Sequence, residues 1–169
     1  MKRIAKFHKV SPEQFKKDWI DTFGLDEEAN IEEIYENIKL PRRATAGSAG
    51  YDFFAPVRLI PPGETIKIPT GIRVEMEPEW VLKCYPRSGL GFKYRLQLNN
   101  TVGIIDSDYF YSDNEGHMFS KITNDTNEEK TIDIAQGEGF MQGIFVEYGI
   151  TLDDDVTDVR NGGFGSTTK

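Results

Sequence analysis

The sequence predicts a mainly β fold, a jelly-roll-like β-barrel, with a short α-helical segment at its N-terminus. Two patterns predict it. After residue 39, short apolar stretches are separated by turns rich in glycine, proline and asparagine, which is typical of antiparallel sandwiches and barrels. Before residue 39, apolar residues recur at three- and four-residue intervals, the period of amphipathic helices. With 169 residues the chain has the length of one domain with its own core.

Residues 1–38 are expected to hold two helices. The first begins at residues 11–14, Ser-Pro-Glu-Gln, which supply an N-cap serine, a proline at the first helical position and a glutamine three residues after the cap, and it ends at Gly24. Each helix carries one apolar stripe: Phe15, Trp19 and Phe23 in the first, and Ile31, Ile34, Tyr35 and Ile38 in the second. Both stripes are expected to pack on the β domain or on a partner subunit. The alternative is a docking module that presents acidic outer faces.

The rest of the chain is expected to form strands at residues 66–68, 72–76, 80–85, 94–98, 118–122, 131–134 and 140–146. Apolar and polar residues alternate in 72–76, so one face of that strand is buried. Residues 124–129 are expected to be a turn. The expected division is a helical N-terminal extension at 1–38, a β domain at 39–152, and an acidic linker with a glycine-rich C-terminal tail at 153–169.

Composition excludes several classes of partner. A formal net charge of −8 argues against nucleic acid or an anionic membrane surface, since such proteins carry a basic face. No apolar run approaches the roughly 18 residues of a membrane span, and the start has no apolar signal core. Cys84 is the only cysteine, so no internal disulfide forms and a reducing compartment is expected. The composition predicts a cytoplasmic protein without nucleic-acid or membrane partners.

Residues 99–109 carry more functional chemistry than a structural hairpin needs. Gly103 permits a close backbone approach, and the Asn100 amide, which donates and accepts, can read a base edge together with exposed backbone groups. Asp106 follows where a carboxylate can hold and deprotonate a water molecule, and Tyr109 can stack beside it. The alternative is a hairpin whose Asn and Asp side chains only cap turns.

Two glycine-rich segments are suited to binding phosphate. In residues 160–168, three glycines, several hydroxyls and Arg160 can surround an anion, while Phe164 can stack on a planar base as a lid. In residues 85–91, Arg87 and Ser88 can hold phosphate oxygens where Gly89 allows a close approach. The alternatives are a frayed terminus and an ordinary turn.

Two further polar residues lie in apolar surroundings. Gln142, in the stretch 137–145, is either a phosphate contact or a hydrogen-bonded core residue, and Asp52 needs a partner if it is buried. The two histidines, His8 and His117, show no metal-ligand spacing with Cys84, and no nucleophilic pair is recognisable. Direct attack by water is therefore the economical mechanism.

Five segments, in this order, resemble the five motifs of the trimeric deoxyuridine triphosphate nucleotidohydrolases, the dUTPases, of the bacterial or phage type. They are 49–52 (Ala-Gly-Tyr-Asp), 86–91 (Pro-Arg-Ser-Gly-Leu-Gly), 102–109 (Val-Gly-Ile-Ile-Asp-Ser-Asp-Tyr), 137–138 with Gln142, and 162–167 (Gly-Gly-Phe-Gly-Ser-Thr). They span roughly three quarters of the chain. The resemblance implies a homotrimer of jelly-roll subunits whose active sites lie at subunit interfaces, each closed by a neighbour's C-terminal tail.

The resemblance also implies the reaction. It is the cleavage of dUTP to dUMP and pyrophosphate, which removes dUTP and supplies dUMP for thymidylate synthesis. Mg²⁺ is implied as the cofactor, held mainly by the triphosphate and waters, with no direct protein ligand. Asp106 is implied to activate the water that attacks the α-phosphorus.

The other site residues follow from their motif positions. Asn100 with the backbone near Ile104 and Ile105 would read uracil, and Tyr109 would pack on deoxyribose and exclude a 2′-hydroxyl. The phosphates would be held by Arg87, Ser88, Gly89 and Gln142. The tail would contribute Phe164 on uracil, Gly165, and Arg160 and Ser166 at the terminal phosphate. Asp52 and Asp108 would support the metal and water network.

The chain departs from the family pattern in four places. Gly139 stands where an arginine is usual, the tail has one residue fewer between Arg160 and its glycine pair, the loop 110–116 is longer, and the N-terminal helices are additional. Two alternatives to hydrolysis stay open: a dCTP deaminase of the same superfamily, and a regulatory binding protein that recruits a partner through residues 1–38.

Overall fold

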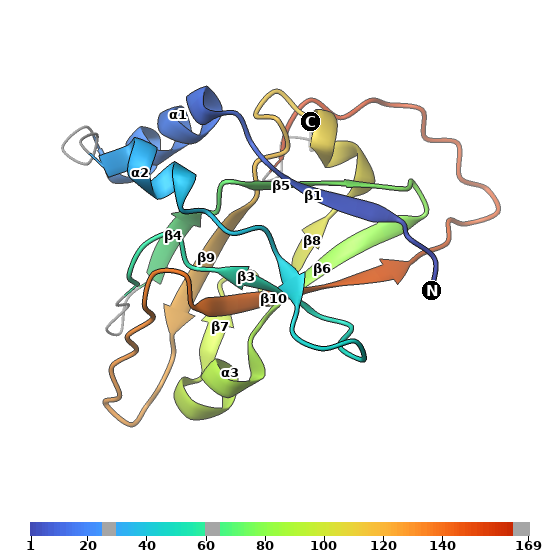
Figure 1. The fold of residues 1–169 in the computed structure, drawn as a ribbon. Helices are drawn as coiled ribbons and strands as arrows, with labels where there is room; N and C mark the ends of the chain where they lie inside the picture. Colours follow the sequence, from blue (N-terminus) through green and yellow to red (C-terminus); the bar gives the residue numbers. More distant parts are fainter. Residues whose placement is uncertain (25–29, 60–64, 164–169) are drawn as a thin grey trace.

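Antiparallel strands build three sheets in the computed structural model, which describes residues 1–24, 30–59 and 65–163 (Figure 1). The strands are β1 (Ala5–Lys9), β2 (Arg42–Arg43), β3 (Tyr51–Phe54), β4 (Thr65–Pro69), β5 (Ile72–Met76), β6 (Trp80–Pro86), β7 (Leu96–Leu98), β8 (Gly103–Ile105), β9 (Phe119–Asn124) and β10 (Gly139–Glu147). The helices are α1 (Pro12–Phe23), α2 (Ile31–Glu36), α3 (Ser88–Tyr94) and the 3₁₀ helix η2 (Ser107–Tyr111).

The largest sheet has the strand order β2-β3-β10-β6-β8, the second has the order β4-β9-β7, and β1 pairs with β5. Every pairing is antiparallel. Side chains from all three sheets and from both N-terminal helices form one buried cluster. The protein is thus a mainly β, jelly-roll-like barrel with α1 and α2 packed at one end (Figure 1), as the sequence predicts.

Helix α1 begins and ends as predicted. The Ser11 hydroxyl accepts a hydrogen bond from the Gln14 backbone N–H at 3.1 Å, and Gly24 ends the helix with a φ of +94°. Phe15 and Trp19 are buried with ring centroids 5.3 Å apart. Replacing a fully buried phenylalanine by alanine typically costs about 3–5 kcal/mol, so the α1 stripe is part of the core. The prediction that both stripes pack on the β domain is confirmed.

Within the N-terminal segment 1–38 the sequence predicted two helices and did not reveal a strand at residues 5–9. These residues form β1, in which Phe7 lies opposite Val74 of β5. The Phe7 ring also contacts Phe53 of β3, with centroids 5.6 Å apart. The partner strand lies almost seventy positions later in the chain, and a local pattern cannot reveal such a pairing.

Two strand predictions need correction, and one helix was not predicted. The strand expected at 94–98 begins only at Leu96, because Tyr94 ends α3, which was not predicted in the glycine-containing sequence at 88–94. Residues 131–134 form no ladder. Their alternation is real, since Ile132 and Ile134 are fully buried, but Ile134 makes a single bridge, to Leu59.

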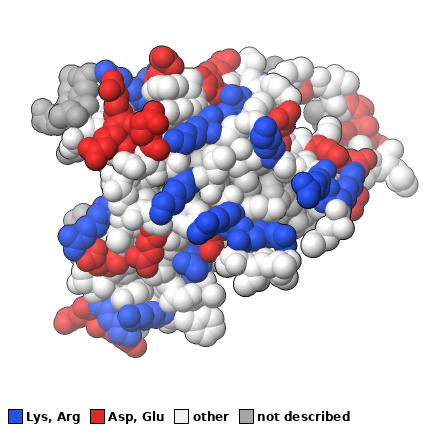
Figure 2. All heavy atoms as spheres, in the orientation of Figure 1, with Lys and Arg blue, Asp and Glu red and all other residues white. Residues whose placement is uncertain are grey.

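The surface carries both signs of charge. On the face shown in Figure 2, acidic side chains gather over α1 and α2, and basic side chains alternate with acidic ones elsewhere. None of the helices in the described ranges combines the length and apolar character that crossing a bilayer requires.

Candidate active site

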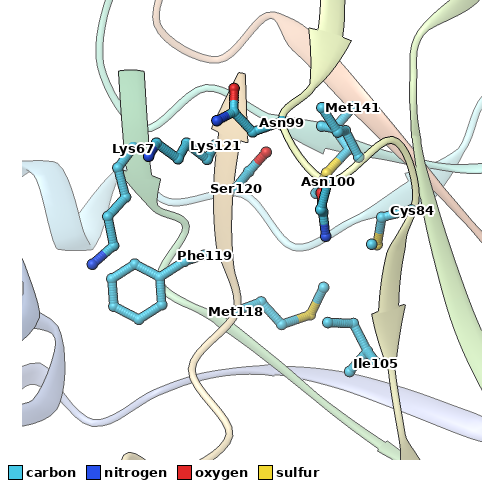
Figure 3. Close-up of a pocket in the computed structure, with 12 residues that line it drawn as sticks. Lys67, Cys84, Asn99, Asn100, Ile105, Met118, Phe119, Ser120, Lys121 and Met141 are labelled. Atoms are coloured by element: carbon cyan, nitrogen blue, oxygen red, sulfur yellow. The ribbon is translucent and has the colours of Figure 1, made fainter. Parts of the chain in front are cut away.

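The turn that joins β7 to β8 forms one wall of a cavity of about 330 Å³. Its lining is mostly apolar and comes from β4, β6, β7, β8, β9 and β10 and from the turn at 99–102: Lys67, Cys84, Leu98, Asn99, Asn100, Gly103, Ile105, Met118, Phe119, Ser120, Lys121 and Met141. Figure 3 shows the Asn100 amide pointing into the cavity between Cys84 and Met118. The size and lining are typical of a small-molecule pocket, so the predicted base-reading residue does face a pocket.

Strand β8 is an edge strand, because it pairs with β6 and ends the order of its sheet. An edge strand leaves alternate backbone N–H and C=O groups without a partner strand. Gly103 lies opposite Cys84, and an added Cβ would come within 3.0 Å of the Cys84 Cβ. Glycine therefore allows β8 to approach β6 here. Ile105 lines the cavity, whereas the Ile104 side chain is 52% exposed, so Ile104 offers backbone groups only.

Asp106 follows β8 directly and precedes η2. One of its carboxylate oxygens lies 2.5 Å from Nη2 of Arg160, and the Asp108 carboxylate lies 2.8 Å from Nε of the same guanidinium. The tail therefore returns to η2 within its own chain, as Figure 1 also shows. Arg160, predicted as a tail residue, therefore meets Asp106, predicted as the water-activating residue.

Tyr109 lies beside these carboxylates in η2. Its hydroxyl donates to the His117 carbonyl at 2.6 Å and accepts from Nδ2 of Asn114 at 2.9 Å. Burial raises the pKa of this hydroxyl. A Cβ added at Gly163 would lie 2.7 Å from Cε2 of the Tyr109 ring, so the tail backbone runs along the ring. Phe164, Gly165 and Ser166 lie outside the described residues.

A second cluster lies at the far end of β6. Nε of Arg87 is 3.2 Å from an Asp52 carboxylate oxygen on β3, and Nη1 of Arg87 donates to the Gly139 carbonyl at 3.3 Å. Asp52 thus has the partner that its surroundings require. Gln142 donates to the Pro86 carbonyl at 3.2 Å, which places three of the sequence motifs together. We call Asp52, Arg87, Gly139 and Gln142 the arginine cluster.

The position of Arg87 explains why residue 139 is a glycine. A Cβ added at this position would lie 2.9 Å from Nη1 and 3.1 Å from Cδ of Arg87. A side chain there would therefore displace the guanidinium. Ser88 and Gly89 follow Arg87 at the exposed start of α3, with open space around Gly89.

The arginine cluster and Asp106 do not meet within one chain. Ile105 lies opposite Leu82, so Asp106 comes level with Val81, while Arg87 follows the end of β6. Six residues of strand separate the two levels, which is roughly 20 Å at about 3.3 Å per residue. Within one chain, the two halves of the predicted site therefore lie at opposite ends of β6.

Sequence reasoning missed the role of His117. It is fully buried, and its Nδ1 lies 2.5 Å from an Asp18 carboxylate oxygen of α1. Burial alone would raise the pKa of Asp18, but hydrogen bonds from His117 and Gln14 outweigh it and lower that pKa. The available signal was Asp18 itself, a carboxylate that is three residues after Phe15 and so belongs to the apolar face of α1.

Metal-binding clusters and the Cys84 thiol are the remaining candidates for reactive chemistry. Within the described ranges no three His, Cys, Asp or Glu side chains converge as a metal cluster would require. Cys84 is free and buried, and desolvation raises the pKa of its thiol to about 12. A thiol with that pKa is protonated near neutral pH, so Cys84 contributes to the cavity wall and not to nucleophilic chemistry.

The fold and this arrangement define the class: a jelly-roll-like β-barrel with a candidate nucleotide site on an edge strand. A family model described as dUTPase matches residues 36–168. The chain belongs to the dUTPase family. It is 43% identical over 139 residues to the deoxyuridine 5′-triphosphate nucleotidohydrolase of Lactococcus lactis, covering 79% of this chain and 91% of that protein. The corresponding Escherichia coli protein is 38% identical over 141 residues, covering 78% and 89%.

Solved structures agree on the fold. The crystal structure of dUTPase from Streptococcus mutans is 37% identical and superposes with a TM-score of 0.59, covering 69% of this chain and 90% of that one. The dUTPase of the Staphylococcus aureus phage phi11 gives a TM-score of 0.63 over 92% of this chain and 97% of that one. At 19% identity it supports the fold alone.

Proposed function

We propose that this protein hydrolyses dUTP to dUMP and pyrophosphate, as the names of its curated relatives describe for those proteins. One observation carries the proposal at the level of the site. The edge strand β8 connects the cavity that Asn100 faces directly to the carboxylate of Asp106. A base held in the cavity would therefore leave its sugar and first phosphate near Asp106. The reaction removes dUTP and supplies dUMP for thymidylate synthesis.

Uracil would be read by the Asn100 amide and by unpaired backbone groups near Ile104 and Ile105. Such a site discriminates well, because a base with the wrong edge leaves buried polar groups unpaired. Tyr109 would pack against the deoxyribose and would exclude a 2′-hydroxyl. Phe164 would stack on the base from the tail.

Asp106 would accept a proton from the attacking water. The water oxygen forms a bond to the α-phosphorus as the bond from that phosphorus to the bridging oxygen breaks, and pyrophosphate leaves with the electron pair. Positioning and neutralisation of charge account for most of such catalysis. Neutralisation would come from Arg87 with Ser88, Gly89 and Gln142, and from Arg160, Gly165 and Ser166 of the tail. Asp52 and Asp108 would hold these groups in place.

Mg²⁺ is the proposed cofactor, and a structural Mg(II) ion is named for the phage phi11 relative. The donor set here fits an ion that arrives with the triphosphate, because Asp52 and Asp106 are each paired with an arginine. When bound, Mg²⁺ would neutralise phosphate charge and take most of its ligands from phosphate oxygens and water. Asp108, which also pairs with Arg160, would support the water shell of the ion indirectly.

A homotrimer is proposed because one chain separates the two halves of the site by roughly 20 Å of strand. A second copy can supply the arginine cluster to Asp106, since closed symmetric assemblies repeat one interface around the ring. Residues 153–169 would be the linker and tail that close a neighbour's site, residues 39–152 the β domain, and residues 1–38 its helical extension. The single buried cysteine suits the cytoplasm.

The proposal is tested by measuring pyrophosphate release from dUTP, dCTP, dTTP and UTP with Mg²⁺ present. We expect release from dUTP alone at a substantial rate. Ammonia release from dCTP, without pyrophosphate from dUTP, would identify a deaminase and overturn the proposal. The family match and its relatives do not favour that outcome.

A further inference from the structure

The buried histidine of the barrel is held in one tautomer by two elements that are far apart in the sequence. The Gly71 backbone N–H donates to Nε2 of His117 at 2.8 Å, so Nε2 accepts and the proton of a neutral ring is on Nδ1. Nδ1 then donates to the Asp18 carboxylate of α1, at 2.5 Å. His117 is fully buried and Asp18 is 9% exposed. Helix α1 is thus attached to the barrel by a specific polar contact as well as by apolar packing.

The backbone around His117 holds the hydroxyl of Tyr109. The His117 carbonyl accepts from this hydroxyl at 2.6 Å, and the Asn114 amide donates to it at 2.9 Å. The Asn114 carbonyl in turn accepts from the His117 backbone N–H at 3.1 Å. The loop 112–117 therefore encloses the hydroxyl, and a shift of His117 moves the position where Tyr109 is anchored.

The start of α1 holds the same loop a second time. The backbone N–H and the hydroxyl of Ser11 donate to the two carboxylate oxygens of Glu115, at 2.7 and 2.6 Å. Glu115 adopts a positive φ of 59°, a conformation that a side chain seldom takes without support. Ser11 and Asp18 lie two turns apart on α1, and they hold the loop at Glu115 and His117.

We propose that Asp18 and Ser11 are positioning residues for the sugar subsite, so that α1 sets how well the enzyme distinguishes deoxyribose from ribose. The proposal rests on the proposed function, in which Tyr109 packs on the sugar. No hydrogen bond or ion pair joins Tyr109 to α1 within the described residues, so α1 acts through the loop 112–117. A ring that closes off the 2′ position must be held within a fraction of an ångström, because a small displacement admits a hydroxyl.

The test compares kcat/KM for dUTP and for UTP in the full-length protein. Asp18→Ala should lower the dUTP/UTP ratio by roughly tenfold or more, mostly through a higher KM for dUTP and a gain with UTP. Asp18→Asn should keep a ratio close to that of the wild type, because its amide oxygen still accepts the Nδ1 proton. Asp21→Ala, an exposed change on the same helix, is the matched control and should leave the ratio unchanged.

An unchanged ratio in folded Asp18→Ala, or equal losses in the alanine and asparagine variants, would overturn the proposal. If Asp18→Ala does not fold, Tyr109→Phe decides, because it removes both hydroxyl contacts and keeps the ring; an unchanged ratio there also overturns the proposal. The activity of the wild type on dUTP distinguishes a failure of the proposed function from a failure of the role of α1. Without it the proposed function fails, whereas with it an unmoved ratio refutes only the role of α1.

Discussion

Arg160 of the tail is bound to Asp106, the carboxylate proposed to activate water, with Nη2 and Oδ2 2.5 Å apart. The same guanidinium reaches Asp108 through Nε at 2.8 Å. The tail is therefore held against η2 by two carboxylates of its own chain. In the proposed function, phosphates that bind Arg160 would compete with both carboxylates, so substrate binding would release Asp106 from its ion pair.

Asp106→Asn should lower kcat by roughly 10²–10⁴-fold, the range of general-base catalysis. The amide keeps the shape of the side chain but cannot take a proton from water. Affinity for a non-hydrolysable dUTP analogue, measured by calorimetry, should stay within about tenfold of the wild type. Asp113→Asn, an exposed change in the following loop, serves as the control. Near-normal turnover in Asp106→Asn would assign the base elsewhere.

Mixing two inactive variants should restore activity if sites are shared between chains. Arg87→Ala removes the arginine cluster's cation and Asp106→Asn removes the base. After co-refolding in equal amounts, about a quarter of sites should combine an intact Arg87 with an intact Asp106 from two chains. Steady-state turnover of the mixture measures the regain, and refolding each variant alone is the control. No regain would place the whole site within one chain.

Gly139→Ala should weaken substrate binding with little effect on folding. The new methyl group would push Arg87 away from Asp52, and a long side chain can move without disturbing the core. We expect KM for dUTP to rise roughly tenfold, the loss of one hydrogen bond to a charged group, while the melting temperature changes little. Gly149→Ala is the control, because nothing lies within 4 Å of its added Cβ. An unchanged KM would show that Arg87 does not bind the phosphates of dUTP.

The Cys84 thiol should resist chemical modification in the native protein. Its pKa of about 12 leaves a negligible thiolate fraction at pH 8, and the side chain is buried. Labelling by a disulfide reagent, followed by absorbance, should proceed only as the protein unfolds. The denatured chain should react at once under the same conditions. Rapid labelling of the folded protein would contradict the buried environment.

Asp18 should contribute to stability in a pH-dependent way. Its pKa is lower in the folded protein than its ordinary value, so its contribution is complete above about pH 4 and is lost as the pH falls through the folded-state pKa. The difference in unfolding free energy between the wild type and Asp18→Asn should therefore shrink on acidification from about pH 6 to pH 3. Urea titrations measure it. A difference that grows on acidification would reverse the sign of this linkage.

Features with a local cause were predictable. Ser11 and Gly24 bound α1 because capping depends on neighbouring residues, and the alternation in β5 follows from the geometry of a strand with one buried face. The five motifs and the polarity of Asn100 and Asp106 are also visible in the chain. By contrast, residues 5–9 form a strand because β5 pairs with them, whereas residues 131–134 form none because only Ile134 makes a bridge, to Leu59. No local pattern specifies whether a partner strand is present.

By itself, the sequence determined the fold class, the residue types of the site and their order along the chain. Only the tertiary structure decided their distances. It separated the arginine cluster from Asp106, explained Gly139 by the position of Arg87, and joined Asp18 to His117 across 99 positions. The physical reason is that hydrogen bonds and steric contacts depend on where a folded backbone brings distant segments together, while composition and spacing report only the chemistry that each segment carries.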